Sequence, residues 1–204
     1  MISVVGCGPG HREGFTVEAL RVVRQSEVLI GAPHLLEIFD RHPGQRLPVV
    51  RSIDALEILR KHVDKKCAVL VSGDPGLASL GAKVREYFGG QVRVVPGVSS
   101  AQAACAVAGW PWEGAGFFSL HAQGGGLPDP DRLRGLRSLV VLGGGDRSAR
   151  ELASWLEADG GDWECAWVRD IGSGSESLQV ASGSELENVD GRGRVVFLAR
   201  RRVP

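Results

Sequence analysis

The first half of the chain alternates short apolar runs with longer amphipathic stretches. Runs rich in β-branched residues predict strands over residues 2–5, 28–30, 68–71 and 92–95. Apolar residues at helical spacing predict helices over 17–26, 53–63 and 80–88, with Leu56, Leu59 and Val63 on one face of the second. Strands and helices that alternate in this way predict a mostly parallel sheet covered by helices.

This periodicity breaks at "GWPWEGAG" (109–116), where glycine, proline and tryptophan interrupt the apolar spacing. We expect a domain boundary there, with an N-terminal α/β domain over 1–112 and a C-terminal α/β domain over 113–204. The alanine-rich segment 99–108 just before the break predicts a closely packed helix. After the break, strands are predicted over 117–120, 139–142, 166–168, 177–181 and 195–199, and a helix over 149–158. Late strands with few helices between them predict a mixed sheet.

Composition narrows the class of protein. Acidic and basic residues balance at 24 each, which argues against a general nucleic-acid binder because such proteins carry a basic excess. The four cysteines are widely spaced and form no CxxC pair, so we expect no zinc site and a reducing, cytoplasmic location. No apolar run approaches the roughly 20 residues of a membrane helix, and the N-terminus lacks the pattern of a signal peptide.

Glycine-containing turns follow three of the predicted strands. They are "VVGCGPG" (4–10), "SGDPGLAS" (72–79) and "VPGVSSAQAA" (95–104). The first lacks the third glycine of a dinucleotide fingerprint, since His11 stands there, and the next predicted strand ends without the acidic residue that holds a ribose. Both features argue against a nicotinamide oxidoreductase. The second turn is not a P-loop, because no Gly-Lys-Ser/Thr follows it.

Asp74, at the centre of the second turn, has two interpretations. It could cap the following helix, since Asp is a favoured N-cap residue. It could instead face a ligand with hydroxyl groups, amines or positive charge. Three such turns would share one edge of a parallel sheet, and open α/β sheets bind ligands outside the carboxyl ends of their strands. Taken together, the turns favour a binding site.

In this order and spacing, the three turns resemble those of the tetrapyrrole methylases, and the resemblance covers essentially the whole chain. Within that family, "LIGAPHLL" (29–36) and "FFSLHAQG" (117–124) are similar to the branch that methylates C5 of precorrin-7 or cobalt-precorrin-7 in cobalamin biosynthesis. The resemblance implies two α/β domains, a parallel-sheet N-terminal one and a mixed-sheet C-terminal one, with S-adenosylmethionine in the cleft between them. It also implies a stand-alone enzyme, a homodimer, and cooperation with a separate C15-methylating decarboxylase.

The resemblance further implies which residues contact the cofactor. They are Pro9, Ser72, Gly73, Asp74, Leu77, Ser99 and Ser100 in the first domain, and Leu142 and Ile171 in the second. Two positions depart from the family pattern: Leu142 stands where Met is usual, and Asp170 precedes Ile171 where Asn is usual.

A corrin precursor carries many carboxylates, which Arg side chains can bind. The candidates near predicted strand ends are Arg12, Arg51, Arg147 and Arg169, although each could be an ordinary surface charge. His121 is the candidate acid or base, because its near-neutral pKa suits proton removal from C5. The five tryptophans could stack on a flat macrocycle, but core and interface packing is the preferred interpretation. No metal site is expected.

Other functions remain open from the sequence. One is methylation at a different ring carbon or of a protein residue such as a diphthine precursor. Another is a non-catalytic sensor that binds S-adenosylmethionine.

Overall fold

The structure is a computed structural model that describes residues 1–120, 126–129, 135–143, 147–190 and 193–202. It divides into two compact units, residues 1–100 and 101–204. This division lies within the first turn of helix α5 (Ser100–Ala108), after Ser100, whereas the predicted domain boundary at 112/113 follows the helix. The predicted boundary stays a prediction. No helix in the described part of the chain is long and apolar enough to cross a membrane.

The first unit is a five-stranded sheet in the order β3-β2-β4-β1-β5, and every strand pair is parallel. Its strands are β1 (Ile2–Gly6), β2 (Val28–Gly31), β3 (Gln45–Pro48), β4 (Cys67–Val71) and β5 (Val92–Val95). Its helices are η1 (Arg12–Gly14), α1 (Val17–Gln25), α2 (Pro33–Glu37), α3 (Ser52–Lys61), α4 (Leu80–Phe88) and η2 (Gly89–Gln91).

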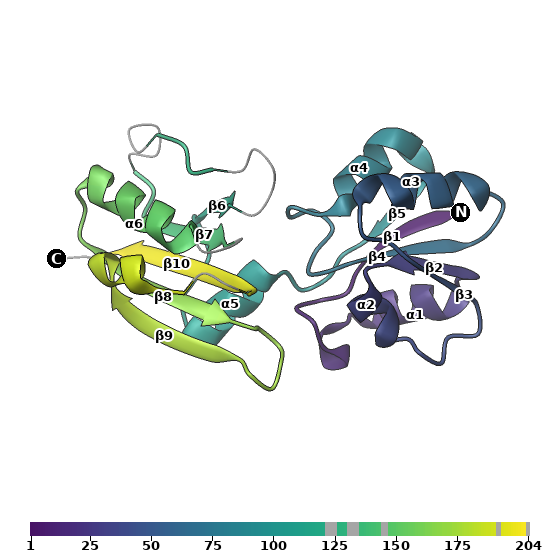
Figure 1. The fold of residues 1–204 in the computed structure, drawn as a ribbon, viewed down its shortest axis with the longest axis horizontal. Helices are drawn as coiled ribbons and strands as arrows, with labels where there is room; N and C mark the ends of the chain where they lie inside the picture. The colour runs from purple at the N-terminus through teal and green to yellow at the C-terminus, as the bar shows by residue number, and fades with distance from the viewer. Residues whose placement is uncertain (121–125, 130–134, 144–146, 191–192, 203–204) are drawn as a thin grey trace. The chain divides into compact units, whose positions relative to one another are not determined.

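Alternate side chains along these strands pack into two hydrophobic cores, one on each face of the sheet. Val5, Leu29 and Leu70 pack against α1 and α2, whereas Val4 and Ile30 pack against α3 and α4. Figure 1 shows the two helix pairs on opposite sides of the sheet. Burial on both faces explains why β1, β2 and β4 read as continuous apolar runs. The predicted parallel sheet is therefore confirmed.

The second unit holds a mixed sheet in the order β6-β7-β10-β8-β9, as the spacing of the late strands predicts. Its elements are β6 (Gly116–Ser119), β7 (Ser138–Leu142), α6 (Ser148–Asp159), β8 (Trp163–Arg169), β9 (Ser177–Ser182), η4 (Gly183–Asn188) and β10 (Val195–Arg201). Helices α6 and η4 cover one face of this sheet around buried Phe197 and Leu152. Helix α5 lies against the other face, where its Cys105 lines the same hollow as Leu198.

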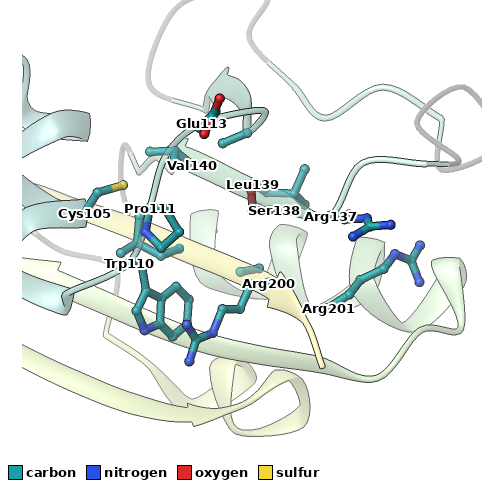
Figure 2. Close-up of a pocket in the computed structure, with 13 residues that line it drawn as sticks. Cys105, Trp110, Pro111, Glu113, Arg137, Ser138, Leu139, Val140, Arg200 and Arg201 are labelled. Atoms are coloured by element: carbon teal, nitrogen blue, oxygen red, sulfur yellow. The ribbon is translucent and has the colours of Figure 1, made fainter. Parts of the chain in front are cut away.

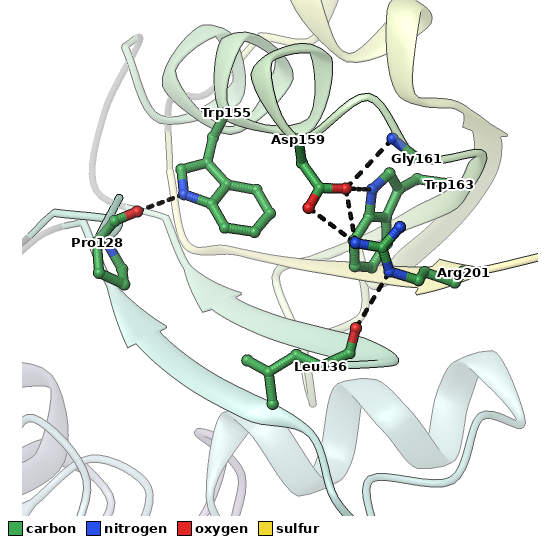
Figure 3. A network of polar contacts seen from close by, with 7 residues as sticks. All are labelled: Pro128, Leu136, Trp155, Asp159, Gly161, Trp163 and Arg201. Atoms are coloured by element: carbon green, nitrogen blue, oxygen red, sulfur yellow. Dashed lines mark hydrogen bonds and ion pairs between the residues drawn. The ribbon is translucent and has the colours of Figure 1, made fainter. Parts of the chain in front are cut away.

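An ion pair between the buried carboxylate of Asp159 and the partly exposed Arg201 ties α6 to the end of β10 (Figure 3). Asp159 is 4% exposed, and Arg201 Nη2 donates to both of its carboxylate oxygens at 2.8 Å. The indole N–H of Trp163 donates to Asp159 Oδ2 at 2.8 Å, and the Arg201 guanidinium stacks 4.6 Å from the Trp163 ring centroid. Such a network stabilises the unit because each buried polar atom has partners.

The pattern of apolar residues does not predict helix α2 or strand β3 of the first unit. Helix α2 spans only five residues, and Pro33 starts it at a position where proline is favoured. Strand β3 has the sequence QRLP, which lacks the apolar alternation of a strand because it lies at the sheet edge and is mostly exposed.

Candidate functional site

The first and second glycine turns meet at one edge of the first sheet. Strand β1 lies between β4 and β5, so the carboxyl ends of these three strands are neighbours. The Cys7 amide donates to the Val71 carbonyl at 2.8 Å. Gly8 and Gly73 then exchange backbone hydrogen bonds of 3.3 and 2.8 Å, which extend the ladder by one isolated bridge. The two turns therefore form one structure.

The third turn packs against this pair without room for side chains. A β-carbon added to Gly97 would lie 2.4 Å from the Gly73 carbonyl oxygen. One added to Gly6 would lie 2.6 Å from the Gly97 nitrogen. Gly8 and Gly73 also have positive φ angles of 66° and 67°, which favour glycine. Glycine is thus required at these positions by close backbone approach and by conformation.

Asp74 links the second and third turns. Its Oδ2 accepts the Gly97 amide hydrogen at 3.0 Å, and its Oδ1 accepts that of Gly76 at 2.7 Å. The helix-cap interpretation of Asp74 is wrong: α4 begins later, and Ser79 caps it by accepting the Gly81 amide at 3.0 Å. The carboxylate is half-buried and retains lone pairs for a ligand, so it can both order the turns and meet a bound group.

The geometry of these turns differs from that of a phosphate site. In phosphate-binding folds, the glycine turn leads directly into a helix whose N-terminal amides point at the anion. Here η1 and the Thr16 cap separate the first turn from α1, and residues 74–79 separate the second from α4. This observation agrees with the argument from sequence against a nicotinamide-binding protein.

The remaining predicted cofactor residues of the first unit lie on or beside these turns. Ser72 is exposed, and Pro9, Leu77 and Ser100 are partly exposed. Ser99 is buried at the start of α5. The structure therefore brings all seven predicted residues of this unit to the carboxyl edge of the sheet.

The two predicted cofactor residues of the second unit share an edge of its sheet. Leu142 ends β7, and Ile171 follows the end of β8. Leu142 and Val168 are both paired with Val196 of the strand between them, so the carboxyl ends of β7 and β8 lie at the same edge. Both Leu142 and Ile171 are buried. Asp170, just before Ile171, has a φ of 49°, an uncommon value outside glycine.

The candidate acid or base and the candidate substrate-binding arginines differ in their surroundings. His121 lies outside the described residues. Arg51 is exposed and already paired with Asp54, its Nη2 lying 2.8 Å from Oδ1, an interaction that raises the pKa of Arg51 and lowers that of Asp54. Arg169 donates to the Asp190 carbonyl oxygen.

Arg12 and Arg147 are exposed. Arg12 belongs to η1, two residues after the first glycine turn, and Arg147 lies at the start of α6.

The second unit also has a small hollow of about 210 Å³ (Figure 2). Trp110 lies at its mouth with the Arg200 guanidinium 4.1 Å from the ring centroid, and Arg200 Nε donates to Glu164 at 2.7 Å. It is lined by the first residues of β7 and the last of β10, so it lies at the opposite sheet edge from Leu142. We therefore keep it separate from the candidate site.

The cysteines offer no reactive group. All four are free and buried. Burial raises the pKa of Cys7 and of Cys165 to about 12, so neither thiol ionises near neutral pH. Within the described ranges, no cluster of His, Cys, Asp and Glu could hold a metal ion.

Comparison with known proteins identifies the relatives of this chain. A sequence model of the family described as Tetrapyrrole (Corrin/Porphyrin) Methylases matches residues 1–187. The cobalt-precorrin-7 C(5)-methyltransferase of Salmonella typhimurium is 32% identical over 162 residues, which cover 78% of this chain and 79% of that protein. A probable cobalt-precorrin-7 C(5)-methyltransferase of Methanocaldococcus jannaschii is 28% identical over 60% of this chain and 61% of that protein.

Among solved structures, the uroporphyrin-III C-methyl transferase of Thermus thermophilus, complexed with S-adenyl homocysteine, superposes with a TM-score of 0.81. It shares 25% identity, and the match covers 98% of this chain and 96% of that one. These matches confirm the predicted two-sheet fold, family and class of enzyme.

Proposed function

The chain belongs to the tetrapyrrole (corrin/porphyrin) methylases, and we propose that it methylates C5 of cobalt-precorrin-7 or precorrin-7 in cobalamin biosynthesis. The choice of C5 is supported by the 32% identity to the Salmonella enzyme, which extends over 78% of this chain. The choice of methyl donor is supported by the glycine turns at the carboxyl edge of the first sheet, together with the homocysteine derivative bound to the Thermus relative.

The residues at that edge suit S-adenosylmethionine, which has no phosphate but carries hydroxyl groups, an ammonium and a carboxylate. The turns offer backbone groups, the Ser72 hydroxyl and the spare lone pairs of Asp74, and they lack the helix N-terminus of a phosphate site. We propose that Pro9, Ser72, Gly73, Asp74, Leu77, Ser99, Ser100, Leu142 and Ile171 contact this cofactor.

When bound, S-adenosylmethionine supplies a methyl group carried on a positively charged sulfur. The part of the protein is then to hold the ring carbon in line and to exclude water, and such positioning can lower a barrier by about 7–11 kcal/mol at best. The tightly packed turns suit this role, because the backbones of Gly6, Gly73 and Gly97 approach one another too closely for side chains to fit between them. We retain His121 as the proposed group that accepts a proton and Arg12 as a substrate-binding residue.

Turnover tests the proposal directly. Purified protein with S-adenosylmethionine and enzymatically prepared cobalt-precorrin-7 or precorrin-7 should give a product with one added methyl group, which ¹³C NMR with labelled methyl donor should place at C5. Methylation at another carbon would assign a different branch of the family. S-adenosylhomocysteine binding by calorimetry without turnover of either substrate would favour a sensor, and binding of NADH instead would contradict the proposal altogether.

We further infer a homodimer in the cytoplasm that works with a separate C15-methylating decarboxylase. One relative, the precorrin-6Y C(5,15)-methyltransferase [decarboxylating] of Mycobacterium tuberculosis, is 29% identical over 86% of this chain but only 45% of its own length. Free cysteines support a reducing compartment. Light scattering of the purified protein and its co-purification with such a decarboxylase would test these points.

A further inference from the structure

A hollow of about 500 Å³ lies beside α1 in the first unit. Its walls come from η1, from α1 and from the connection between α2 and β3, and every residue that lines it belongs to this unit. Of its lining residues, Arg12 lies two residues after the first glycine turn, whereas Arg24 and Arg41 lie near the residues that lead into β2 and β3. Its floor is apolar and includes Leu20, Ile38 and Phe39.

The polar rim of this hollow has an excess of positive charge. Arg12, Arg24 and Arg41 line it, and Asp40 is the acidic residue among its lining. No ion pair joins any of these three arginines to a carboxylate among the described residues. Arg93, by contrast, is paired with Glu18 on the other side of α1 from the hollow's lining residues. Three guanidinium groups that make no ion pair with any described residue thus line one concave surface, an arrangement that suits an anion with several charges.

The backbone around the hollow is held in place. His42 Nε2 donates to the Val23 carbonyl at 2.9 Å while its Nδ1 accepts the Gly44 amide hydrogen at 3.1 Å. Through these two hydrogen bonds the ring ties the α2–β3 connection to the end of α1. A β-carbon on Gly44 would lie 2.3 Å from the Glu27 carbonyl oxygen, so this connection also packs closely on the sheet.

Below this connection, Phe39 packs edge-on against Phe15 with 5.3 Å between ring centroids. The arginines of the rim therefore project from fixed positions, which lowers the entropy lost when a ligand binds.

We infer that this hollow binds peripheral carboxylates of the macrocyclic substrate, through Arg12, Arg24 and Arg41. This inference rests on the proposed function, which requires a substrate with many carboxylate side chains. Planar guanidinium groups match carboxylates in bidentate geometry, and the apolar floor accommodates the methylene groups that carry them. Arg24 and Arg41 thereby become proposed substrate-binding residues together with Arg12. Arg51 is not included, because it is already paired with Asp54.

Titration with uroporphyrin III, a porphyrin with eight carboxylates, tests the hollow through quenching of tryptophan fluorescence. The double variant Arg24→Gln/Arg41→Gln should bind the porphyrin about tenfold more weakly than the wild type does. Added salt should weaken porphyrin binding by the wild type. The matched control is Arg21→Gln/Arg46→Gln, which removes the same charge from two exposed positions outside the hollow. The control should bind within twofold of the wild type.

Two further measurements separate this inference from the proposed function. S-adenosylhomocysteine affinity should be unchanged in both double variants, and in turnover the Arg24/Arg41 variant should have a raised KM with little change in kcat. Porphyrin affinity and KM equal to those of the control would overturn the inference while leaving the methyltransferase proposal intact. Equal binding of the uncharged octamethyl ester would also overturn it. Absence of any turnover by the wild type would contradict the proposed function, while the porphyrin titration still reports on the hollow.

Discussion

At the residue scale, the Asp74 carboxylate connects two turns that the chain separates by more than twenty residues. We predict that Asp74→Ala lowers the free energy of unfolding by about 1.5–3 kcal/mol, the usual range for hydrogen bonds to a charged group. It should also weaken S-adenosylhomocysteine binding by at least about tenfold, because the third turn loses its anchor. Asp74→Asn keeps one acceptor oxygen, so its stability and its affinity for S-adenosylhomocysteine should lie between those of the wild type and those of Asp74→Ala. Urea denaturation and calorimetry measure both effects.

The control for this prediction is Ser79→Ala. It removes the α4 cap, for about 1 kcal/mol, but leaves the link from Asp74 to Gly97 intact. If Asp74→Ala and Ser79→Ala lost stability alike and both bound S-adenosylhomocysteine normally, the carboxylate would be structural only.

Gly97 is the second residue on which the site depends. Gly97→Ala places a β-carbon 2.4 Å from the Gly73 carbonyl oxygen, a backbone atom that cannot move aside without separating the turns. We predict a destabilisation of about 1–3 kcal/mol or more, as for other overpacked positions. Gly90→Ala is the matched control, since nothing lies within 4 Å of its added β-carbon. Equal melting temperatures for the two variants would contradict the packing described here.

The sequence predicts this site only in part. The order of the turns indicates an edge at which a ligand binds, and parallel pairing of β4, β1 and β5 brings them together. The partner of Asp74 is not predictable from spacing, because Gly97 approaches through tertiary packing. Arg24 and Arg41 were also missed, since unpaired surface arginines carry no sequence signal until the fold brings them around one hollow.

At the element scale, prediction from periodicity works where an element is long and buried. Strand β4 and helix α4 are examples: the predicted ranges 68–71 and 80–88 agree with Cys67–Val71 and Leu80–Phe88 within one residue. It fails for β3, an exposed edge strand whose backbone pairing with β2 is not encoded in apolar alternation. Pairing with a neighbour, rather than local preference, determines such strands.

The contact between α6 and β10 gives a prediction at the same scale. Asp159→Ala should cost about 1.5–3 kcal/mol, because it leaves the Trp163 indole and the partly exposed Arg201 guanidinium without their buried acceptor. The control is Glu164→Gln, which weakens the more exposed pair with Arg200 and should cost about 0–1 kcal/mol. Urea denaturation of both variants measures the difference. Equal costs would mean that Asp159 contributes no more than a surface ion pair.

At the scale of the whole molecule, each unit contains one cysteine whose pKa burial raises to about 12, and this thiol reports on the unfolding of its own unit. Cys7 belongs to the first unit and Cys165 to the second, and burial raises the pKa of each from 9.0 to about 12. A thiol reagent at pH 8 should therefore react slowly with the native protein and reach all four cysteines only after denaturation.

The same thiols predict how stability changes at alkaline pH. Because the folded pKa is raised, the folded state keeps its proton longer than the unfolded state. The free energy of unfolding that each raised pKa contributes is fully present below about pH 9. It falls as the thiols of the unfolded state ionise, and it is lost near the folded pKa of about 12. Each thiol contributes a slope of about 1.4 kcal/mol per pH unit in that window.

We therefore predict that Cys7→Ala and Cys165→Ala each flatten the decline of unfolding free energy between about pH 9.5 and 11, although each lowers stability at pH 7 through the lost sulfur. Comparing variant and wild type at every pH cancels the titration of lysines and tyrosine, which both share. If the two units unfold separately, each substitution should flatten only the transition of its own unit. A slope unchanged by either substitution would mean that the thiols are reached by solvent before the units unfold.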